Sequence, residues 1–289
     1  MKVKFTKMHG CGNDYIYITD FENKIKTPGA LSIRLSDRRR GIGGDGLILI
    51  CKSDKADAKM RIFNSDGSEG KMCGNGIRCV GKLLYDDNLI SHKNMKIDTL
   101  SGIKNVILSE GYGNIKETKY KEKNFSILSV DMGKPDFTPD KIPVDIKGDR
   151  IIDREVEING KKYKINCVSM GNPHCVIFCK DIFKTDVEGI GKEIENSKLF
   201  PEGVNVEFVH IDGNSSISMR VWERGSGETF ACGTGACASV VLAVENGFFG
   251  KNQDITVKLR GGELIIKYED DKVFMTGPAE EVFKGEVEI

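Results

Sequence analysis

The sequence predicts an α/β (α+β) protein built as two pseudo-symmetric domains, each a strand layer or barrel wrapped around a central helix. The first observation behind this prediction is an internal repeat. Two blocks that lie 159 positions apart align without a gap, RIFNSDGSEGKMCGNG at 61–76 and RVWERGSGETFACGTG at 220–235. Each block ends in Cys-Gly-x-Gly, at Cys73 and at Cys232, and then enters an apolar pattern of helical spacing.

The second observation is that the repeat extends upstream of both blocks. Gly12-Asn13 precedes Cys73 and Gly171-Asn172 precedes Cys232, with 60 positions from Asn to Cys in both halves. Solenoid units repeat every ~20–50 residues. The longer period therefore indicates a duplicated domain.

A looser third correspondence sets Gly41-Ile42…Asp45 beside Gly203-Val204…Glu207, each followed by an apolar run.

Short strand-like runs, separated by Gly, Asn and Asp clusters, dominate both halves. In order, they are Val3–Phe5, Tyr15–Ile18, Leu47–Cys51, Met60–Phe63, Val106–Leu108, Val176–Cys179, Val206–Ile211, Ile217–Trp222, Ile255–Leu259 and Leu264–Tyr268. Helical spacing is found after each Cys-Gly-x-Gly, at 77–84 and at 237–244, and Gly247 is placed to end the second helix. Further helices are expected at Ala30–Asp37 and around Ile190–Asn196.

The domain boundary is expected at a Lys- and Glu-rich linker, residues 116–123. The first domain then spans 1–123 and the second 124–279, and residues 280–289 are expected to return to the first. A chain of 289 residues is long enough for two such domains, each with its own core.

Composition argues against several classes of partner. The 43 basic and 43 acidic residues balance, which disfavours nucleic acid or an anionic membrane as the main partner. No signal or membrane-spanning segment is visible, and the nine cysteines form no disulfide framework. A cytoplasmic protein with reduced thiols is expected.

The two glycine-framed cysteines predict proton-transfer chemistry. A free thiol has a pKa of about 8.5, and the N–H groups at a helix N-terminus favour its thiolate. Two such helix ends facing one another would form an anion site suited to a carboxylate. One thiolate could then remove the α-proton of a bound acid while the opposing thiol protonates the other face, which inverts the stereocentre.

Other interpretations of the cysteines and glycines are weaker. The remaining seven cysteines fit ordinary core packing. Cys73-x5-Cys79 and Cys175-x3-Cys179 lack the Cys-x2-Cys spacing of a zinc knuckle, so no metal site is expected. Gly41–Gly46 fits G-x-G-x-x-G, but a strand follows it where a nucleotide loop requires a helix. Glu69 and Glu228 are expected to be structural, through pairing with backbone or with Arg61 and Arg220.

Six motifs together resemble the diaminopimelate epimerase family, in the family's order and over nearly the whole chain. They are HGCGND at 9–14, NSDGS at 64–68, MCGNGIR at 72–78, GNPH at 171–174, ERG at 223–225 and ACGTG at 231–235. The resemblance implies an isomerase that interconverts LL- and meso-diaminopimelate without a cofactor, on the path to lysine and peptidoglycan. It also implies a homodimer, with the active site in the cleft between the domains.

The resemblance also implies roles for individual residues. Cys73 and Cys232 would be the acid and base pair, and His174 and Glu223 would tune the two thiols. Substrate would be bound by a larger set of side chains and backbone N–H groups. That set comprises Asn13, Asn64, Gly74, Asn75, Asn172, Asn205, Glu223, Arg224, Gly233 and Thr234. Gly46 departs from those members that carry Gln near the site.

Three alternatives remain open at this stage. Another cofactor-free amino-acid racemase, of the proline, hydroxyproline or histidine type, would use the same two thiols. A thiol-redox or metal-binding protein would account for the number of cysteines. A Cys–His acyl-transfer enzyme using His174 or His9 would leave the second glycine-framed cysteine without a role.

Overall fold

The structure is a computed structural model that describes residues 1–109 and 124–289. The chain divides into two compact units, one of Met1–Asp131 with Thr276–Ile289 and one of Met132–Met275. The predicted linker, residues 116–123, lies outside the described residues. No helix of the described ranges is long and apolar enough to cross a membrane.

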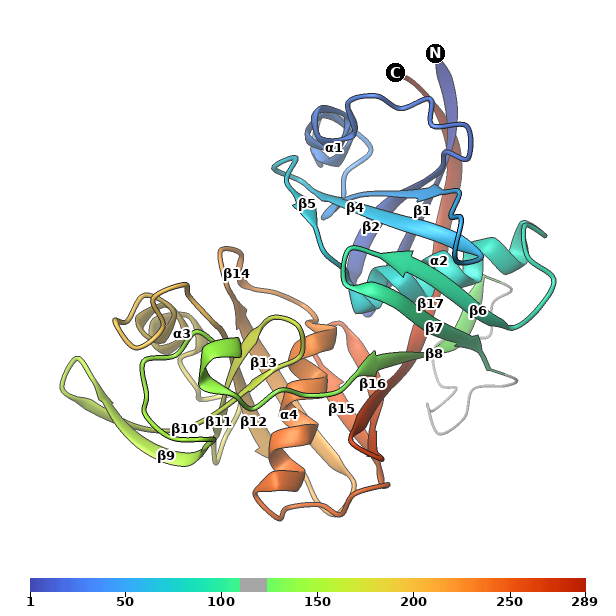
Figure 1. The fold of residues 1–289 in the computed structure, drawn as a ribbon. Helices are drawn as coiled ribbons and strands as arrows, with labels where there is room; N and C mark the ends of the chain where they lie inside the picture. The colour runs from blue at the N-terminus through green and yellow to red at the C-terminus, as the bar shows by residue number, and fades with distance from the viewer. Residues whose placement is uncertain (110–123) are drawn as a thin grey trace. The chain divides into compact units, whose positions relative to one another are not determined.

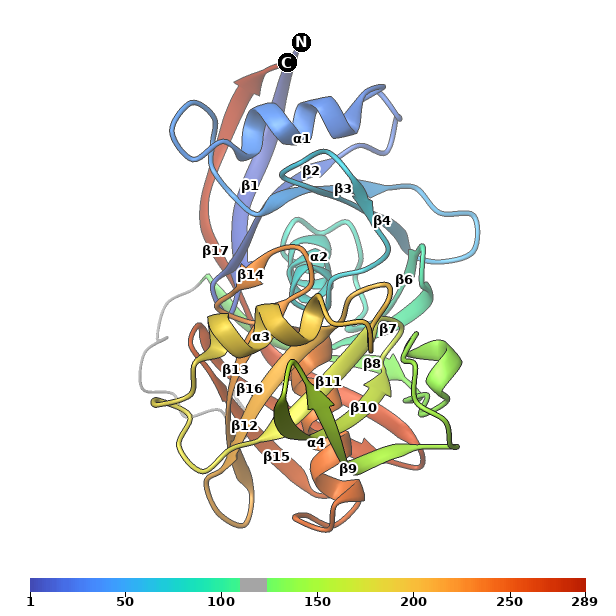
Figure 2. The same cartoon turned by 90° about the vertical axis from the view of Figure 1, so that its left-hand side faces the viewer.

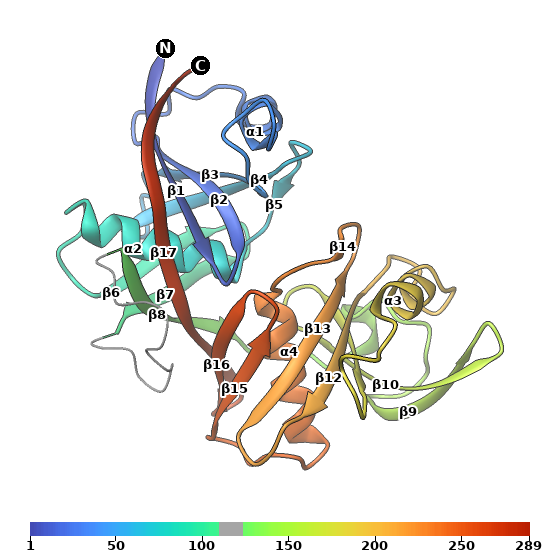
Figure 3. The same cartoon turned by 180° about the vertical axis from the view of Figure 1, so that it is seen from behind.

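The first unit gathers strands around helix α2 (Gly74–Asp86), which Figure 2 shows end-on. The helix contacts β1 (Lys2–Gly10), β2 (Asn13–Thr19) and β7 (Gly102–Leu108). The unit's other elements are α1 (Pro28–Ser36), β3 (Gly46–Cys51), β4 (Ala58–Asn64), β5 (Glu69–Gly70) and β6 (Asn94–Thr99). It also contains most of β8 (Phe125–Gly133) and of β17 (Lys272–Glu288), which both cross the boundary between the units. The two chain ends lie side by side in this unit, where β17 pairs antiparallel with β1 (Figures 1 and 3).

The second unit repeats this arrangement around helix α4 (Gly233–Glu245). The helix contacts β10 (Lys161–Ser169), β11 (Pro173–Phe178), β12 (Asn205–Ile211) and β16 (Gly262–Glu269). The other elements are a short 3-10 turn η1 (Pro139–Lys141), β9 (Ile151–Ile158), α3 (Val187–Glu195), β13 (Ser216–Glu223), β14 (Gly227–Glu228) and β15 (Asp254–Leu259). The predicted fold class, with one strand-wrapped helix in each half, is confirmed.

Apolar side chains explain why α2 and α4 occupy the centres of their units. Ten of the thirteen residues of α4 are buried, and the run Ala236–Ala243 is buried throughout. In α2 the buried set also includes Arg78 and Lys82. Arg78 is fully buried, and its guanidinium donates to the carbonyls of Gly74 and Pro278 and to Asn75 Oδ1. A buried cation is tolerated because its donors are satisfied in this way.

Both helices end at equivalent positions with a left-handed residue. Gly247 has φ +78° after α4, and Asn88, 159 positions earlier, has φ +55° after α2. Glycine and asparagine adopt this conformation at the least steric cost, so each can end a helix. The predicted role of Gly247 is confirmed, and Gly247 N–H donates to Val244 O.

Strand pairing follows the same period of 159 residues in both units. Leu47 pairs with Phe63 across β3 and β4, and Val206 pairs with Trp222 across β12 and β13. The parallel pairings agree as well, with Tyr15 beside Gly46 and His174 beside Asn205. The looser correspondence of Asp45 with Glu207 is therefore wrong by three positions. The structural equivalent of Glu207 is Ile48, because both strands begin in the same register without a gap.

Several strands were missing from the sequence-based prediction. β9 and β10 form a hairpin that turns at Asn159-Gly160, with φ +49° and +79°. These two positive angles are typical of a type I′ turn, for which Asn-Gly is the preferred pair. β6, β8 and β17 were also missed, because polar residues interrupt their apolar positions and weaken the apolar signal.

Candidate active site

Cys73 is the N-cap residue of α2. Its backbone is extended (φ −131°, ψ 121°), and Gly76 N–H donates to its sulfur over 3.3 Å. The sulfur thus takes the place that a Ser or Asp oxygen usually has at a helix N-terminus. The N–H groups of this first helical turn and the helix dipole favour negative charge on the sulfur.

Cys232 is the N-cap residue of α4 in the same geometry. Its backbone angles are φ −116° and ψ 110°, and Gly235 N–H donates to its sulfur, also over 3.3 Å. The arginine–glutamate ion pairs that precede the two N-cap cysteines in sequence also match. Arg61 and Arg220 each form a bidentate ion pair with the glutamate eight residues on, at 2.8 and 3.0 Å. The expected pairing of Glu69 and Glu228 with these arginines is confirmed.

Around Cys73 the side chains favour the thiol form. The Cys73 thiol donates to Asn13 Oδ1 over 3.2 Å. Asn13 Nδ2 in turn donates to Asp45 Oδ2 at 2.7 Å, which fixes the amide with its oxygen toward the sulfur. Asp45 is held by Arg38, whose guanidinium also binds Asp14.

The acids of this network have pKa values displaced in opposite directions. Burial and the charge of Asp14 raise the pKa of Asp45. The pKa of Asp14 is lowered: burial opposes this, but hydrogen bonds from Arg38 and Lys7 outweigh it. Tyr15 lies two positions from Asn13, and burial, together with the charges of Cys73 and Asp45, raises its pKa well above the ordinary value. Tyr15 therefore stays a neutral phenol beside the thiol.

Around Cys232 the corresponding positions carry different chemistry. His174 replaces Tyr15, and it is fully buried between Glu207 and Asn172. The distance from His174 Nδ1 to Glu207 Oε1 is 2.7 Å, and from Nε2 to Asn172 Oδ1 it is 3.1 Å. Asn172 Nδ2 donates to Thr234 Oγ1 over 3.3 Å, and that hydroxyl lies 3.5 Å from the Cys232 sulfur.

Two carboxylates act on the Cys232 thiol. Burial comes first, followed by the charges of Glu223 and Glu207, and together they raise the pKa of Cys232 well above its ordinary value. Burial also raises the pKa of Glu223, while a hydrogen bond from Thr229 Oγ1 opposes that shift. In this structure the Cys232 sulfur therefore favours its protonated form.

The remaining predicted residues contact neighbours within their own units. Asn64 lies at the end of β4 and donates to Ser68 Oγ, and Asn75 is buried against Arg78. Asn205 donates to Pro173 O and accepts from the backbone N–H of Arg224, which ties β12 to the β13–β14 turn. A Cβ atom at Gly46, the equivalent of Asn205, would overlap the Phe63 carbonyl, so the backbone there leaves no room for a side chain.

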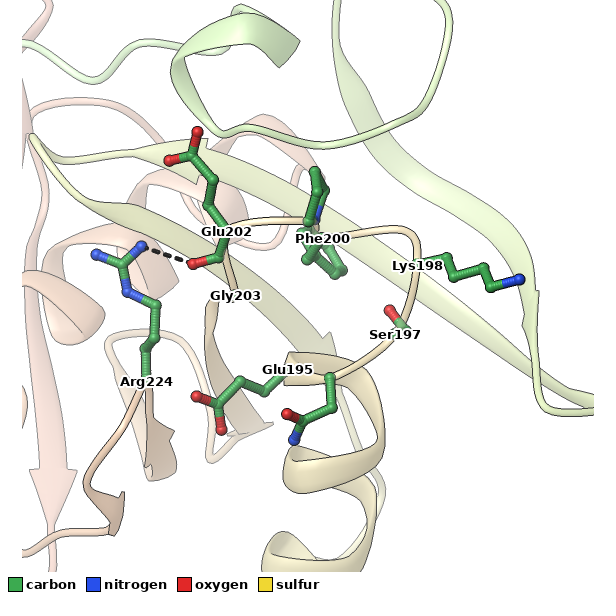
Figure 4. Close-up of a pocket in the computed structure, with 9 residues that line it drawn as sticks. Glu195, Ser197, Lys198, Phe200, Glu202, Gly203 and Arg224 are labelled. Atoms are coloured by element: carbon green, nitrogen blue, oxygen red, sulfur yellow. Dashed lines mark hydrogen bonds between the residues drawn. The ribbon is translucent and has the colours of Figure 1, made fainter.

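Arg224 lines a pocket of about 390 Å³ within the second unit (Figure 4). Its guanidinium donates to Glu202 O over 3.0 Å, whereas the Lys198 side chain points away from it. Glu195, also in the lining, accepts from Trp222 Nε1 and from Gly225 N–H. The turn that carries Glu223 and Arg224 is therefore anchored on the end of α3.

The structure thus brings the predicted residues together in two groups, one in each unit. Cys73, Gly74, Asn75 and Asn13 surround the start of α2. Cys232, Gly233, Thr234, Asn172, His174 and Glu223 surround the start of α4. Asn64 and Arg224 are more exposed, and their side chains bind Ser68 and Glu202 O.

Three residues that shape these groups were not predicted as site residues from the sequence: Asp45, Tyr15 and Glu207. Glu207 carries the clearest signal, because it is the one charged residue between Val206 and Val209 in a buried strand. The three-position error in the looser correspondence hid its match with Ile48. No group of three or more His, Cys, Asp or Glu side chains in the described ranges could hold a metal ion.

Replacing Glu223 with glutamine is expected to shift the ionisation of Cys232 to lower pH, because the variant removes a nearby negative charge that raises the thiol pKa. The measurement is the alkylation rate of Cys232 as a function of pH, followed by peptide mass spectrometry, since only the thiolate reacts. Glu228→Gln, on the same hairpin but paired with Arg220, is the matched control. An unchanged alkylation midpoint in Glu223→Gln would contradict the assignment.

Comparison with known proteins identifies the family. The sequence profile described as diaminopimelate epimerase matches residues 5–137 and 166–282. A diaminopimelate epimerase of Acetivibrio thermocellus is 47% identical over 289 residues, covering 99% of both chains. One of Agathobacter rectalis is 49% identical over 300 residues, covering 99% of this chain and 100% of the relative.

Solved structures agree on the fold. A Bacillus anthracis phenazine biosynthesis protein of the PhzF family superposes with a TM-score of 0.69 at 15% identity, over 100% of both chains. At that identity the likeness concerns the fold alone. The sequence relatives carry the assignment, and this chain belongs to the diaminopimelate epimerase family. The predicted family is confirmed.

Proposed function

We propose that this protein epimerises LL-2,6-diaminopimelate to the meso isomer without a cofactor, with Cys73 and Cys232 as the acid and base. The observation that carries the proposal is the duplicated cap, in which a thiol takes the N-cap position of a central helix in each unit with the same N–H···S distance. Family membership supplies the substrate.

The proposed reaction moves one proton off and one proton onto the α-carbon. A thiolate removes the α-proton, and the C–H bonding pair passes into the α-carbon and its carboxylate. The thiol of the other cysteine then gives its proton to the opposite face of that carbon. Charge and protons balance, because the thiolate becomes a thiol and the thiol a thiolate.

Backbone N–H groups are proposed to stabilise the intermediate. Gly74 and Asn75 follow Cys73 at the start of α2, and Gly233 and Thr234 follow Cys232 at the start of α4. The first N–H groups of a helix have no partner within the helix, so they can bind a carboxylate and the extra charge that develops on it.

The distal amino-acid end is proposed to be read by the polar residues at the strand ends. Asn64, Asn205, Glu223 and Arg224 are suited to an ammonium and a carboxylate, and Arg224 already lines a pocket. Asn13 accepts a hydrogen bond from the Cys73 thiol, and Asn172 donates one to Thr234 beside Cys232. These two asparagines are proposed to orient the reacting end of the substrate. A cytoplasmic homodimer in lysine and peptidoglycan precursor synthesis completes the proposal.

The test is proton exchange in deuterated water. Reduced, metal-free protein is mixed with LL-diaminopimelate, and the α-proton signal is followed by NMR. Loss of that signal with formation of the meso isomer supports the proposal. Exchange with proline or hydroxyproline and none with diaminopimelate would assign a different racemase activity. No exchange with any amino acid would reject the two-thiol reaction.

Replacing Arg224 with alanine is expected to raise KM for diaminopimelate by about 10- to 100-fold, with a smaller effect on kcat. The physical reason is the loss of charge-assisted hydrogen bonds worth about 1.5–3 kcal/mol. Steady-state kinetics separate the two constants. Arg150→Ala, which removes an exposed ion pair with Glu245, is the control. An unchanged KM would remove Arg224 from the binding site.

A further inference from the structure

The pair of His174 and Glu207 is a fully buried acid–imidazole contact in the second unit. Both side chains are 0% exposed, and 2.7 Å separates His174 Nδ1 from Glu207 Oε1. Glu207 Oε2 has no hydrogen-bond partner among the described residues. A carboxylate with one unsatisfied buried oxygen is costly, so its single contact with the imidazole carries the compensation for its charge.

The contacts of Asn172 indicate how many protons His174 carries. Asn172 turns its oxygen toward His174 Nε2 and its amide nitrogen toward Thr234 Oγ1. The oxygen can only accept, so Nε2 must donate. With Glu207 as a carboxylate, its oxygen also accepts, and Nδ1 then donates. An imidazole that donates from both nitrogens is the imidazolium.

A chain of hydrogen bonds then runs in one direction to the thiol. Because Asn172 donates to Thr234 Oγ1, the Thr234 hydroxyl proton is available to the Cys232 sulfur, 3.5 Å away. A neutral His174 with a bare Nε2 would instead require the Asn172 amide to turn over. The Asn172 oxygen would then take the Thr234 proton, and the Cys232 thiolate would lose that donor.

Among the residues that the structure describes, the buried acid–imidazole pair is found in the second unit and not in the first. The equivalents of His174 and Glu207 are Tyr15 and Ile48, and in the first unit the thiol of Cys73 donates directly to Asn13. The spatial match is close. A Cβ atom built on Gly235 would meet Glu207 Oε1, and one built on Gly76 would meet Ile48 Cδ1. At equivalent positions of the two units, an acid therefore lies beneath the start of α4 and an alkyl group beneath the start of α2.

We propose that Glu207 is a positioning residue that keeps protons on both ring nitrogens of His174 and thereby directs the Thr234 hydroxyl toward the Cys232 thiolate. The role in turnover rests on the proposed epimerase reaction. The proton arrangement on His174 does not, since it follows from contacts within the protein. Glu223 is the other acid that acts on Cys232, but it lies on β13 and is not part of this chain.

The test uses the whole protein and Glu207→Gln, which keeps the shape of the side chain and removes its charge. Ring ¹⁵N and attached ¹H signals of the four histidines are recorded at neutral pH, and the His174 signal is assigned by its loss in His174→Asn. The wild type is expected to show protons on both nitrogens, and Glu207→Gln on one. A single ring proton in the wild type would overturn the proposal, whether or not the variant folds.

Kinetics test the link to Cys232. Glu207→Gln is expected to lower kcat by about 10- to 100-fold with KM changed less than about 3-fold, as for other partners that orient a functional imidazole. Ser239→Ala is the control, since Ser239 is a buried polar residue of α4 that donates to Met219 Sδ. Ser239 takes no part in the hydrogen bonds that connect Glu207 with Cys232. An unchanged kcat in Glu207→Gln would overturn the link. A wild type inactive on diaminopimelate would reject the proposed function and leave the ring-proton result standing.

Discussion

Replacing Cys232 with serine is expected to lower kcat for epimerisation by at least about 10³-fold, and Cys73→Ser by a similar factor. A serine hydroxyl is far too weak an acid to form the anion that removes the α-proton, and positioned acid–base groups contribute ~10²–10⁴-fold each. The fold should persist, because serine is among the preferred N-cap residues and can accept the same N–H bond as the sulfur. Thermal unfolding and far-UV circular dichroism check that condition.

Controls for this prediction come from cysteines on the same helices. Cys79 on α2 and Cys237 on α4 are both fully buried, and burial raises the pKa of Cys79 to about 11. Cys79→Ala and Cys237→Ala should keep near-normal kcat. Both substitutions remove one small buried side chain, so the expected loss is one of stability, about 1 kcal/mol. Near-normal kcat in Cys73→Ser or Cys232→Ser would refute the two-thiol mechanism.

The cysteine caps could be predicted from sequence because their signals are local. Cys-Gly-x-Gly before an apolar pattern specifies a helix start, and repetition at one offset shows that the same start was used twice. The four helices were predicted for the same reason, since spacing and end residues such as Gly247 lie within one short window. Strand β17 was missed because its position depends on a partner far along the chain, β1. The β9–β10 hairpin was missed although its Asn-Gly turn is a local signal.

The partners of the thiols were harder to predict. Asp45 reaches Asn13 only because β2 and β3 pair in parallel, and Glu207 reaches His174 only through the same pairing of β11 and β12. Neither contact joins residues at a sequence spacing that would predict the contact. Glu207 could have been found by extending the offset of 159 without a gap, since a glutamate would then stand opposite an isoleucine in two otherwise apolar strands.

The duplication therefore preserved the backbone and changed several side chains around the two cysteine caps. The N-cap geometry, the arginine–glutamate pairs and the strand register agree between the units. The side chains around the two caps differ at three equivalent positions: Asn75 against Thr234, Tyr15 against His174, and Asn64 against Glu223. A substrate with one reacting centre and one distal centre is itself asymmetric. Unequal thiol environments fit the proposed reaction between the LL and meso isomers.

Alanine substitutions at the two helix starts are expected to have unequal effects on catalysis. Gly235→Ala is expected to lower kcat by about 10- to 100-fold, and Gly76→Ala by less than about 5-fold. The Cβ atom at position 235 would lie 2.6 Å from Glu207 Oε1, and the one at 76 would lie 2.7 Å from Ile48 Cδ1. The isoleucine methyl can rotate away at a cost of about 0.5–1.5 kcal/mol.

The glutamate oxygen has no such freedom, because it is pinned to His174 in a fully buried site. To make room, it must break that contact or shift the start of α4, and either change disturbs Cys232. The measurements are kcat and the His174 ring signals in both variants. Equal effects of the two substitutions on kcat would indicate that alanine acts only through the shared helix geometry. A larger effect at 235, together with an altered His174 signal, would show that the acid beneath the second helix matters for the chemistry.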